Sequence, residues 1–301
     1  RSPCGQYTRA ARPGVAGKQR HLQRISPPGG VATGRNGRPP DRPEAAFDSA
    51  SQWTIAPIYA MAAQRHMHEH GTTPEQLAWV KVAASLHAQH NPNALLRKPV
   101  TVDEVLASGV VADPLHKMDC CVITDGGGAL VVTSAAVARR LKRPLVRLRG
   151  SGQTIHTNQG GLVDLTRTGA EVSGRLAFAQ AGVGPQDIQY ASVYDNFTIM
   201  VILQLEDLGF CKKGQGGAFV QDGNLVSGRG ALPWNTDGGG LCNNHPANRG
   251  GITKVIEAVR QLRGEAHPAV QVPGCQLALV SGPGLVLGSG HAHATLILER
   301  T

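Results

Sequence analysis

The stretch DIQYASVYDNFTIMVILQLEDLGF, residues 187–210, combines two hydrophobic patterns that indicate the fold class. Its first part is short and contains aromatic and β-branched residues, which is typical of a strand. Its second part, from Asn196 onward, has apolar residues on nearly every side of a helix, which indicates a helix that is buried all round. The sequence therefore predicts a strand that runs directly into a buried helix, with Tyr194 and Asp195 at the junction.

Strands and helices continue to alternate on both sides of this unit. Before it, the patterns predict helices, then a strand–turn–strand–helix unit, then a strand and a helix, over 50–66, 73–86, about 102–106, 121–141, 144–152 and 165–181. After it, they predict a helix and two strands, over 251–264, 275–284 and 293–300. This alternation predicts an α/β fold with largely parallel pairing, and the closing strand pair adds some antiparallel pairing.

The composition indicates a globular protein. With 301 residues, the chain is long enough for one large domain or two of ordinary size, and 38 Gly and 19 Pro indicate many turns and close backbone contacts. No apolar run approaches the ~20 residues that cross a bilayer. Six Cys occur without CxxC or zinc-finger spacing, which is typical of reduced thiols. Because the sequence also lacks the apolar stretch of a secretory signal, we expect a cytoplasmic protein.

The net charge of +9 is concentrated in a tail, residues 1–47. This tail holds nine Lys and Arg against two acidic residues, so the remaining chain carries only +2. The tail is rich in Gly, Pro and Arg and shows neither helical nor strand periodicity, which predicts disorder. An arm that binds RNA or another polyanion is the alternative, but no nucleic-acid motif is present. A nearly neutral body does not predict a nucleic-acid partner.

The histidines do not form a metal site by their spacing. His66, His68 and His70 stand at i, i+2 and i+4, so they do not share one face of a helix, and no carboxylate-backed ligand set accompanies them. The sequence therefore predicts no bound metal.

A glycine-rich loop, GGGLCNNHPANRGG at residues 238–251, precedes the last predicted helix and carries His245 in its middle. Glycine leaves the backbone open to close approach, because it has no Cβ. We interpret the loop as one that brings His245 against a flat substrate. A capped turn with a hydrogen-bonded His245 is the alternative.

Three ordered stretches resemble the thiolase superfamily, and most of all its lipid-transfer-protein and sterol-carrier-type members: 193–219, 232–246 (LPWNTDGGGLCNNHP) and 257–265 (EAVRQLRGE). HGTTPEQLAWV and TDGGGALVV extend the resemblance to about five-sixths of the chain. The resemblance implies a layered αβαβα fold. After the tail, residues 48–148 correspond to an incomplete N-terminal half and residues 149–301 to a complete C-terminal half.

The resemblance implies an acyltransferase that makes or breaks a carbon–carbon bond next to a coenzyme A thioester in lipid metabolism. It further implies that the thioester is the substrate, that no cofactor is bound, and that the protein is a homodimer. His245 matches the histidine of the thiolase Gly-His-Pro motif, and Tyr194 and Asn196 lie where thiolases carry Asn-Glu-Ala-Phe, so the resemblance implies that His245, Tyr194 and Asn196 are catalytic. Tyr194 stands in for the Asn that holds an oxyanion water. Five further residues are implied at the coenzyme A thioester: Asn243, Gly239, Gly240, Ser281 and Gly282.

The sequence departs from the thiolase pattern at both catalytic cysteines. The nucleophilic Cys belongs to a strand-to-helix elbow in the first half, whereas Cys4 lies in the aperiodic tail. The second Cys belongs to a Cys-x-Gly turn, where Ser281 and Gly282 stand here. His291 and His293 are candidate substitutes, although we expect them to face solvent.

Two other functions stay open. Some relatives that cleave aldol adducts of acyl-CoAs resemble this chain at Tyr194, and they work with a zinc-ribbon/OB-fold partner protein. They carry a second Tyr at the position of Asn243, which this chain lacks. The second alternative is a non-catalytic remnant that binds acyl-CoA or lipid.

Overall fold

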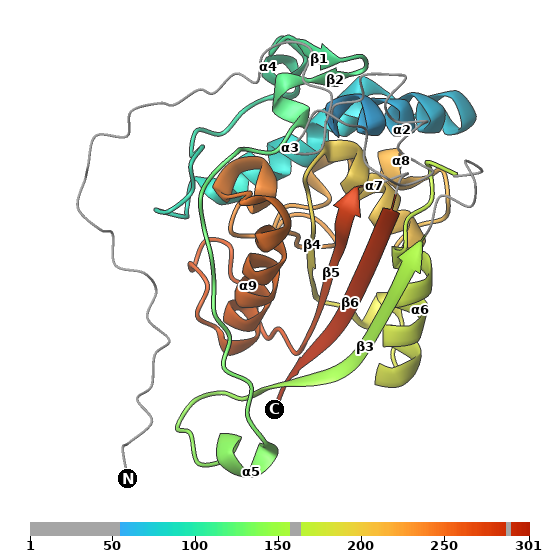
Figure 1. Ribbon diagram of the computed structural model, residues 1–301. Helices are drawn as coiled ribbons and strands as arrows, with labels where there is room; N and C mark the ends of the chain where they lie inside the picture. Colours follow the sequence, from blue (N-terminus) through green and yellow to red (C-terminus); the bar gives the residue numbers. More distant parts are fainter. Residues whose placement is uncertain (1–54, 157–163, 287–289) are drawn as a thin grey trace, which may run out of the picture.

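The computed structural model describes residues 55–156, 164–286 and 290–301, so the predicted disordered tail lies outside the described residues. The described part of the chain begins with helices and a short antiparallel hairpin (Figure 1). These first elements are α2 (Ile55–His70), α3 (Pro74–Ala88), α4 (Val102–Leu106), β1 (Val110–Ala112), β2 (Leu115–His116) and η1 (Lys117–Asp119).

The second part contains the main sheet and the helices around it. Its first elements are α5 (Ala135–Ala138), β3 (Val146–His156), α6 (Ala170–Ala181), η3 (Pro185–Asp187), β4 (Tyr190–Val193) and α7 (Thr198–Asp207). Its later elements are α8 (Gly216–Val220), η4 (Gln221–Gly223), η5 (Gly239–Asn243), η6 (Ala247–Gly250), α9 (Gly251–Arg263), β5 (Leu277–Val286) and β6 (Gly290–Arg300). Within the described residues, no helix is both long and apolar enough to cross a membrane.

The start of α3 is fixed by a capping box. The Thr73 side chain accepts a hydrogen bond from the Gln76 backbone N–H, and the Gln76 side chain accepts one from Thr73 N–H. Pro74 occupies the first turn, where its missing N–H costs nothing. The same arrangement of Thr101 and Glu104 begins α4. Local chemistry alone therefore sets both helix starts.

The main sheet has the strand order β3-β6-β5-β4. Only β4 and β5 pair in parallel, whereas β3–β6 and β5–β6 are antiparallel. The prediction of largely parallel pairing is therefore wrong. The reason is topological. β3 and β4, which α6 connects, lie at opposite edges of the sheet, and the antiparallel pair β5 and β6 lies between them (Figure 1).

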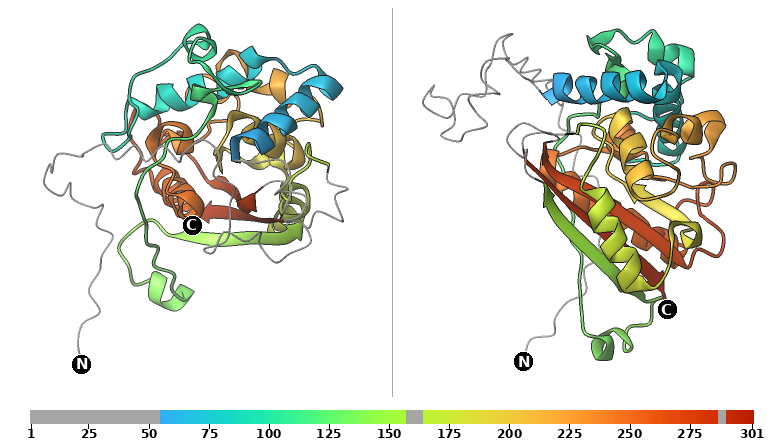
Figure 2. Two further views of the ribbon diagram at one scale, coloured as in Figure 1. Left: turned by 45° about the horizontal axis from the view of Figure 1, so that its top comes forward. Right: turned by 90° about the vertical axis from the view of Figure 1, so that its right-hand side faces the viewer.

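The two faces of the sheet are covered by different helices (Figure 2). On one face, α6 packs tightly on β3, because a Cβ at Gly150 or Gly152 would come within 2.2 Å of α6 carbonyl oxygens. On the other face, α9 covers a smaller cluster of buried apolar residues that includes Tyr190, Ala278 and Val280. Successive strand residues point to opposite faces, so β4 and β5 contribute to both layers.

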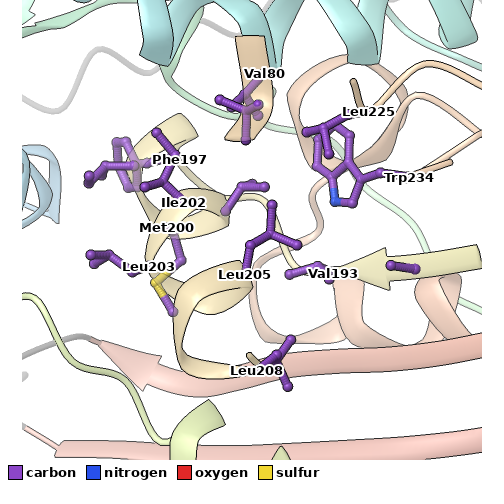
Figure 3. Close-up of a cluster of buried hydrophobic side chains, with 14 of the residues drawn as sticks. Val80, Val193, Phe197, Met200, Ile202, Leu203, Leu205, Leu208, Leu225 and Trp234 are labelled. Atoms are coloured by element: carbon purple, nitrogen blue, oxygen red, sulfur yellow. The ribbon is translucent and has the colours of Figure 1, made fainter. Parts of the chain in front are cut away.

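The helix α7 is buried all round, as the sequence predicts. Its side chains Met200, Ile202, Leu203 and Leu205 lie among apolar residues from α3, the sheet and the loop that carries Trp234 (Figure 3). Because only four residues separate the end of β4 from the start of α7, this packing fixes the strand-to-helix junction in place.

Residues 121–134, all within the described part of the chain, contain no strand, so the predicted strand–turn–strand is wrong. The side chains of Ile123 and Val132 are 92% and 91% exposed. The apolar pattern is that of a buried strand, but a strand needs neighbours to satisfy its backbone, and no described strand pairs with this segment. The segment instead runs along α9, where a Cβ at Gly128 would lie 2.7 Å from Ile256 Cδ1.

Candidate active site

The junction between β4 and α7 carries the first part of the site. The backbone N–H of Tyr194 donates to the Ser281 carbonyl at 2.9 Å, which extends the parallel pairing of β4 with β5 by one residue. The Asn196 side-chain oxygen accepts a hydrogen bond from Phe197 N–H at 3.1 Å, and the backbone carbonyl of Asn196 accepts one from Cys121 N–H at 2.9 Å. Asn196 thus shapes the entry into α7, and the structure shows no direct contact of its side chain with His245.

The glycine loop meets this junction from the other side. Gly238 and Gly239 have φ of 93° and 60°, a region that glycine adopts without strain. A Cβ at Gly239 would lie 2.1 Å from Asp195 Oδ2, and one at Gly240 would lie 3.3 Å from His245 Cδ2. The group that comes close to the backbone here is therefore the Asp195 carboxylate.

Tyr194 and His245, fifty-one residues apart, meet at the centre of the site. Tyr194 Oη lies 2.8 Å from His245 Nε2 and 2.8 Å from the Ala247 carbonyl oxygen. A carbonyl oxygen can only accept, so the phenol proton goes to Ala247 and His245 Nε2–H donates to the phenol oxygen. Gly250 packs against the ring, where a Cβ would lie 3.2 Å from Tyr194 Cε2.

Burial keeps this pair uncharged near neutral pH. It lowers the pKa of His245, an effect that the Asp195 carboxylate opposes and the Lys254 ammonium reinforces. Burial also raises the pKa of Tyr194 well above its usual range, and the nearby Cys121 and Asp195 raise it further. Both groups can therefore act as hydrogen-bond donors without carrying charge.

Residues 121–124 connect the two parts of the site. Val122 N–H donates to the Gly240 carbonyl at 3.0 Å, and His245 N–H donates to Thr124 Oγ1 at 3.1 Å. Burial raises the pKa of the Cys121 thiol to about 12, so it stays protonated at neutral pH. A protonated thiol is a weak nucleophile, so these surroundings do not activate Cys121.

The remaining predicted residues occupy different places. Asn243 is buried and donates through Nδ2 to Asp237 Oδ2 at 2.9 Å. Gly282 lies against Tyr194, where a Cβ would be 3.2 Å from Tyr194 Cβ. Ser281 points to the opposite face of the sheet, toward α6, because neighbouring strand residues alternate.

Ser281 belongs to a separate buried polar cluster. Its Oγ lies 2.9 Å from His293 Nε2 and 3.0 Å from Thr295 Oγ1, which in turn contacts Ser173 of α6. His293 Nδ1 lies 3.3 Å from His291 Nε2. Both histidines are buried, so the prediction that they face solvent is wrong. The alternation of β6 places these residues on the face that α6 covers.

Sequence reasoning missed Asp195 and Lys254. The Lys254 ammonium lies 2.6 Å from Asp195 Oδ1, and both residues are buried. A signal was available, because Lys254 and Ala258 are four residues apart on α9 and belong to its buried side. A lysine on the buried side of an amphipathic helix needs a buried anion as its partner.

The fold and the site define an α/β protein with a polar hydroxyl–imidazole pair at the carboxyl end of a parallel strand, where ligands of such sheets bind. The Thiolase C-terminal domain-like family matches residues 152–300. An acetyl-CoA acetyltransferase of Methanothermobacter thermautotrophicus is 38% identical over 270 residues, which are 86% of this chain and 68% of that protein.

A lyase and a solved aldolase are also similar to this chain. A 17-hydroxy-3-oxo-4-pregnene-20-carboxyl-CoA lyase of Mycobacterium tuberculosis is 39% identical over 246 residues, which are 78% of this chain and 63% of that protein. The solved structure of an Ltp2-ChsH2(DUF35) aldolase aligns with a TM-score of 0.78 at 34% identity, and the alignment covers 88% of this chain and 70% of that chain.

The chain belongs to the thiolase family, as its motifs predict. It spans 63–68% of the length of the two curated relatives above.

Proposed function

We propose that this chain acts on acyl-CoA thioesters as a thiolase-like acyltransferase that makes or breaks a carbon–carbon bond. The observation that carries the proposal is the 2.8 Å contact between Tyr194 Oη and His245 Nε2. In this chemistry, negative charge develops on the thioester oxygen. Each fixed donor aimed at such an oxygen lowers the activation free energy by about 3–4 kcal/mol in comparable sites.

The neutral states of the two side chains support this role. Both His245 Nε2–H and the Tyr194 hydroxyl can donate, and an acyl oxygen that receives their two hydrogen bonds replaces the contact between them and the contact of Tyr194 with the Ala247 carbonyl. We propose that Gly282, Asn196 and Asn243 shape the walls for the coenzyme A thioester, with Gly239 and Gly240. Ser281 has no place in this proposal, because its hydroxyl faces α6.

Calorimetric titration of coenzyme A into the protein tests the proposal. We expect binding heat with coenzyme A in the wild type, and with a non-cleavable acyl-CoA analogue we expect His245→Ala to weaken binding by at least tenfold. His68→Ala is the matched control, because His68 lies exposed on α2. An absence of heat at millimolar coenzyme A in the wild type contradicts the proposal.

A retro-aldolase is the second candidate, and the similarity to a lyase and to a solved aldolase favours it. In this reaction a base removes the proton of a β-hydroxyl group, the Cα–Cβ bond breaks, and the thioester enolate then takes up a proton. The products are a carbonyl compound and a shortened acyl-CoA. We propose a zinc-ribbon/OB-fold protein as partner for this activity, as the DUF35 component is for the solved aldolase.

The two candidates differ in the substrate that is cleaved. For the retro-aldolase, Tyr194→Phe is expected to abolish cleavage of a β-hydroxyacyl-CoA, measured with the partner present, while coenzyme A binding survives. Cleavage of a β-ketoacyl-CoA with free coenzyme A instead supports the acyltransferase. Binding without cleavage of either substrate supports the non-catalytic remnant.

Three further features complete the proposal. We propose a homodimer and a cytoplasmic location, and a division of the chain into a partial N-terminal half at 48–148 and a C-terminal half at 149–301. All five cysteines in the described part of the chain are free thiols, which supports the location. All four strands of the main sheet lie between residues 146 and 300, which supports the division.

A further inference from the structure

Asp195 connects the two segments of the candidate site. It follows Tyr194 directly in the chain and is 1% exposed. Its Oδ1 accepts a hydrogen bond from Gly240 N–H at 2.8 Å, and its Oδ2 accepts one from Leu241 N–H at 3.1 Å. Both donors belong to η5, the turn that ends two residues before His245.

Lys254 supplies the third contact to the same carboxylate. It stands in the first turn of α9, is 2% exposed, and donates to Asp195 Oδ1 at 2.6 Å. A buried carboxylate without a partner cation is strongly unfavourable, so Lys254 makes the buried anion tolerable. A junction residue, the η5 turn and α9 therefore meet at one carboxylate.

We propose that Asp195 and Lys254 are a positioning pair that holds His245 against Tyr194. The ion pair fixes the backbone on both sides of the Tyr194–His245 contact, because one partner adjoins Tyr194 and its carboxylate carries the turn that leads to His245. The proposal rests on the proposed function, in which the donor pair serves an acyl oxygen.

The arrangement needs an anion for a geometric reason. An apolar pair of the same size packs a protein interior at least as well as a buried ion pair does. It cannot, however, accept hydrogen bonds from the two η5 N–H groups, which would then stay buried and unpaired. The close approach of this carboxylate also requires glycine at position 239, since a Cβ there would lie 2.1 Å from Asp195 Oδ2.

The imidazole responds to both charges. After burial, which has the largest effect and lowers the pKa of His245, the Asp195 carboxylate raises this pKa and the Lys254 ammonium lowers it. The other titratable group that faces the ring is Tyr194, which is hydrogen-bonded to it. Removing Asp195 therefore lowers the pKa of His245, whereas removing Lys254 raises it. A general loss of stability does not produce these opposite shifts.

The main test is an NMR measurement of the ¹⁵N-labelled His245 imidazole in the full chain. In the wild type we expect a slowly exchanging Nε2–H signal, and we expect Tyr194→Phe to remove it. The double variant Asp195→Asn/Lys254→Met removes the pair without leaving a buried charge. We expect this variant to lose the signal and, with a cleavable thioester, to lose at least about tenfold in kcat with KM within about threefold.

A matched control removes another ion pair. Asp207→Asn/Lys213→Met deletes a pair at the end of α7, where Lys213 Nζ lies 2.6 Å from Asp207 Oδ1. We expect it to lower stability but to keep the His245 signal. An unchanged signal in Asp195→Asn/Lys254→Met overturns the positioning role. The signal decides this without any activity, so a failure of the proposed function is distinguishable from a failure of the positioning pair.

A single variant keeps the test decisive if the double variant does not fold. Lys254→Gln leaves an amide to donate to Asp195 and leaves the two η5 hydrogen bonds in place. We expect the imidazole pKa of His245 to rise, because a nearby cation is lost. No change in this pKa contradicts a direct link between Lys254 and His245.

Discussion

At the scale of single residues, the site depends on a phenol and an imidazole that stay neutral because they are buried. The Tyr194 hydroxyl has two partners, the His245 ring and the Ala247 carbonyl. Ala247 has φ of 49°, which is unusual for a residue with a side chain. Such a conformation persists only where surrounding contacts impose it, and the hydrogen bond from Tyr194 is one of them.

The contact between the two rings is expected to have a measurable energy. Tyr194→Phe leaves the His245 donor and the Ala247 acceptor without this partner and is expected to reduce the free energy of unfolding by about 1–3 kcal/mol. A double-mutant cycle with His245→Ala in urea denaturation is expected to give a coupling of at least about 0.5 kcal/mol. Additive effects of the two substitutions contradict a direct hydrogen bond.

Two glycines with similar backbone conformations separate steric contact from backbone strain. Gly239 has φ of 60°, and a Cβ there would clash with Asp195. Gly264 has φ of 72°, and the space that a Cβ would occupy is open. Gly264→Ala is expected to cost about 1 kcal/mol, the cost of a left-handed residue alone. Gly239→Ala is expected to cost at least about 1 kcal/mol more, because something must shift. Equal losses in urea denaturation contradict the close packing.

At the scale of elements, the sequence predicts what local chemistry determines. The capping box of α3 and the all-round burial of α7 follow from patterns within the elements themselves. The segment 121–134 shows the limit of such patterns, because a strand depends on the neighbours that it pairs with. The helix 165–181 is shorter than predicted and begins at Ala170, after turns at 164–169.

The helix α9 buries a carboxyl group that titrates near neutral pH. Burial and the nearby Asp237 raise the pKa of Glu257 to about 7, from 4.5. The folded protein therefore keeps this proton where the unfolded chain has released it. The resulting stabilisation is complete below about pH 4.5 and is lost as the pH rises through about 7.

Urea denaturation at pH 5 and pH 8 tests this effect. As the pH rises from 5 to 8, we expect the ionisation of Glu257 to reduce the free energy of unfolding of the wild type by about 2–3 kcal/mol. We expect this reduction to be absent in Glu257→Gln. Glu171→Gln, at an exposed position on α6, is the control and is expected to keep the wild-type pH dependence. An identical pH dependence in Glu257→Gln contradicts a raised pKa in the folded state.

At the scale of the whole molecule, the family resemblance predicts more than the periodicity does. The convergence of Tyr194 and His245 follows from motifs that lie fifty-one residues apart, and the structure brings them together. The order of the strands and the burial of His291 and His293 could not be predicted, because both depend on which strands become neighbours. The Asp195–Lys254 pair likewise forms between segments that only the folded chain brings together.

The exposed segment along α9 allows a global comparison. Val132 is 91% exposed and Val193 is fully buried. Val132→Asp is expected to change the free energy of unfolding by less than about 0.5 kcal/mol, as surface substitutions do. Val193→Asp is expected to prevent stable folding, because it buries an unpaired charge. A large loss of stability in Val132→Asp, measured by thermal unfolding, shows that the segment is part of a paired sheet.

An acyl-CoA thioester is expected to bind where Tyr194 and His245 meet. The most direct measurement is the NMR signal of the ¹⁵N-labelled His245 imidazole during titration with a non-cleavable acyl-CoA analogue. We predict a saturable shift at His245 in the wild type and no shift at the exposed His68. Binding that saturates by calorimetry while the His245 signal stays unchanged contradicts the claim.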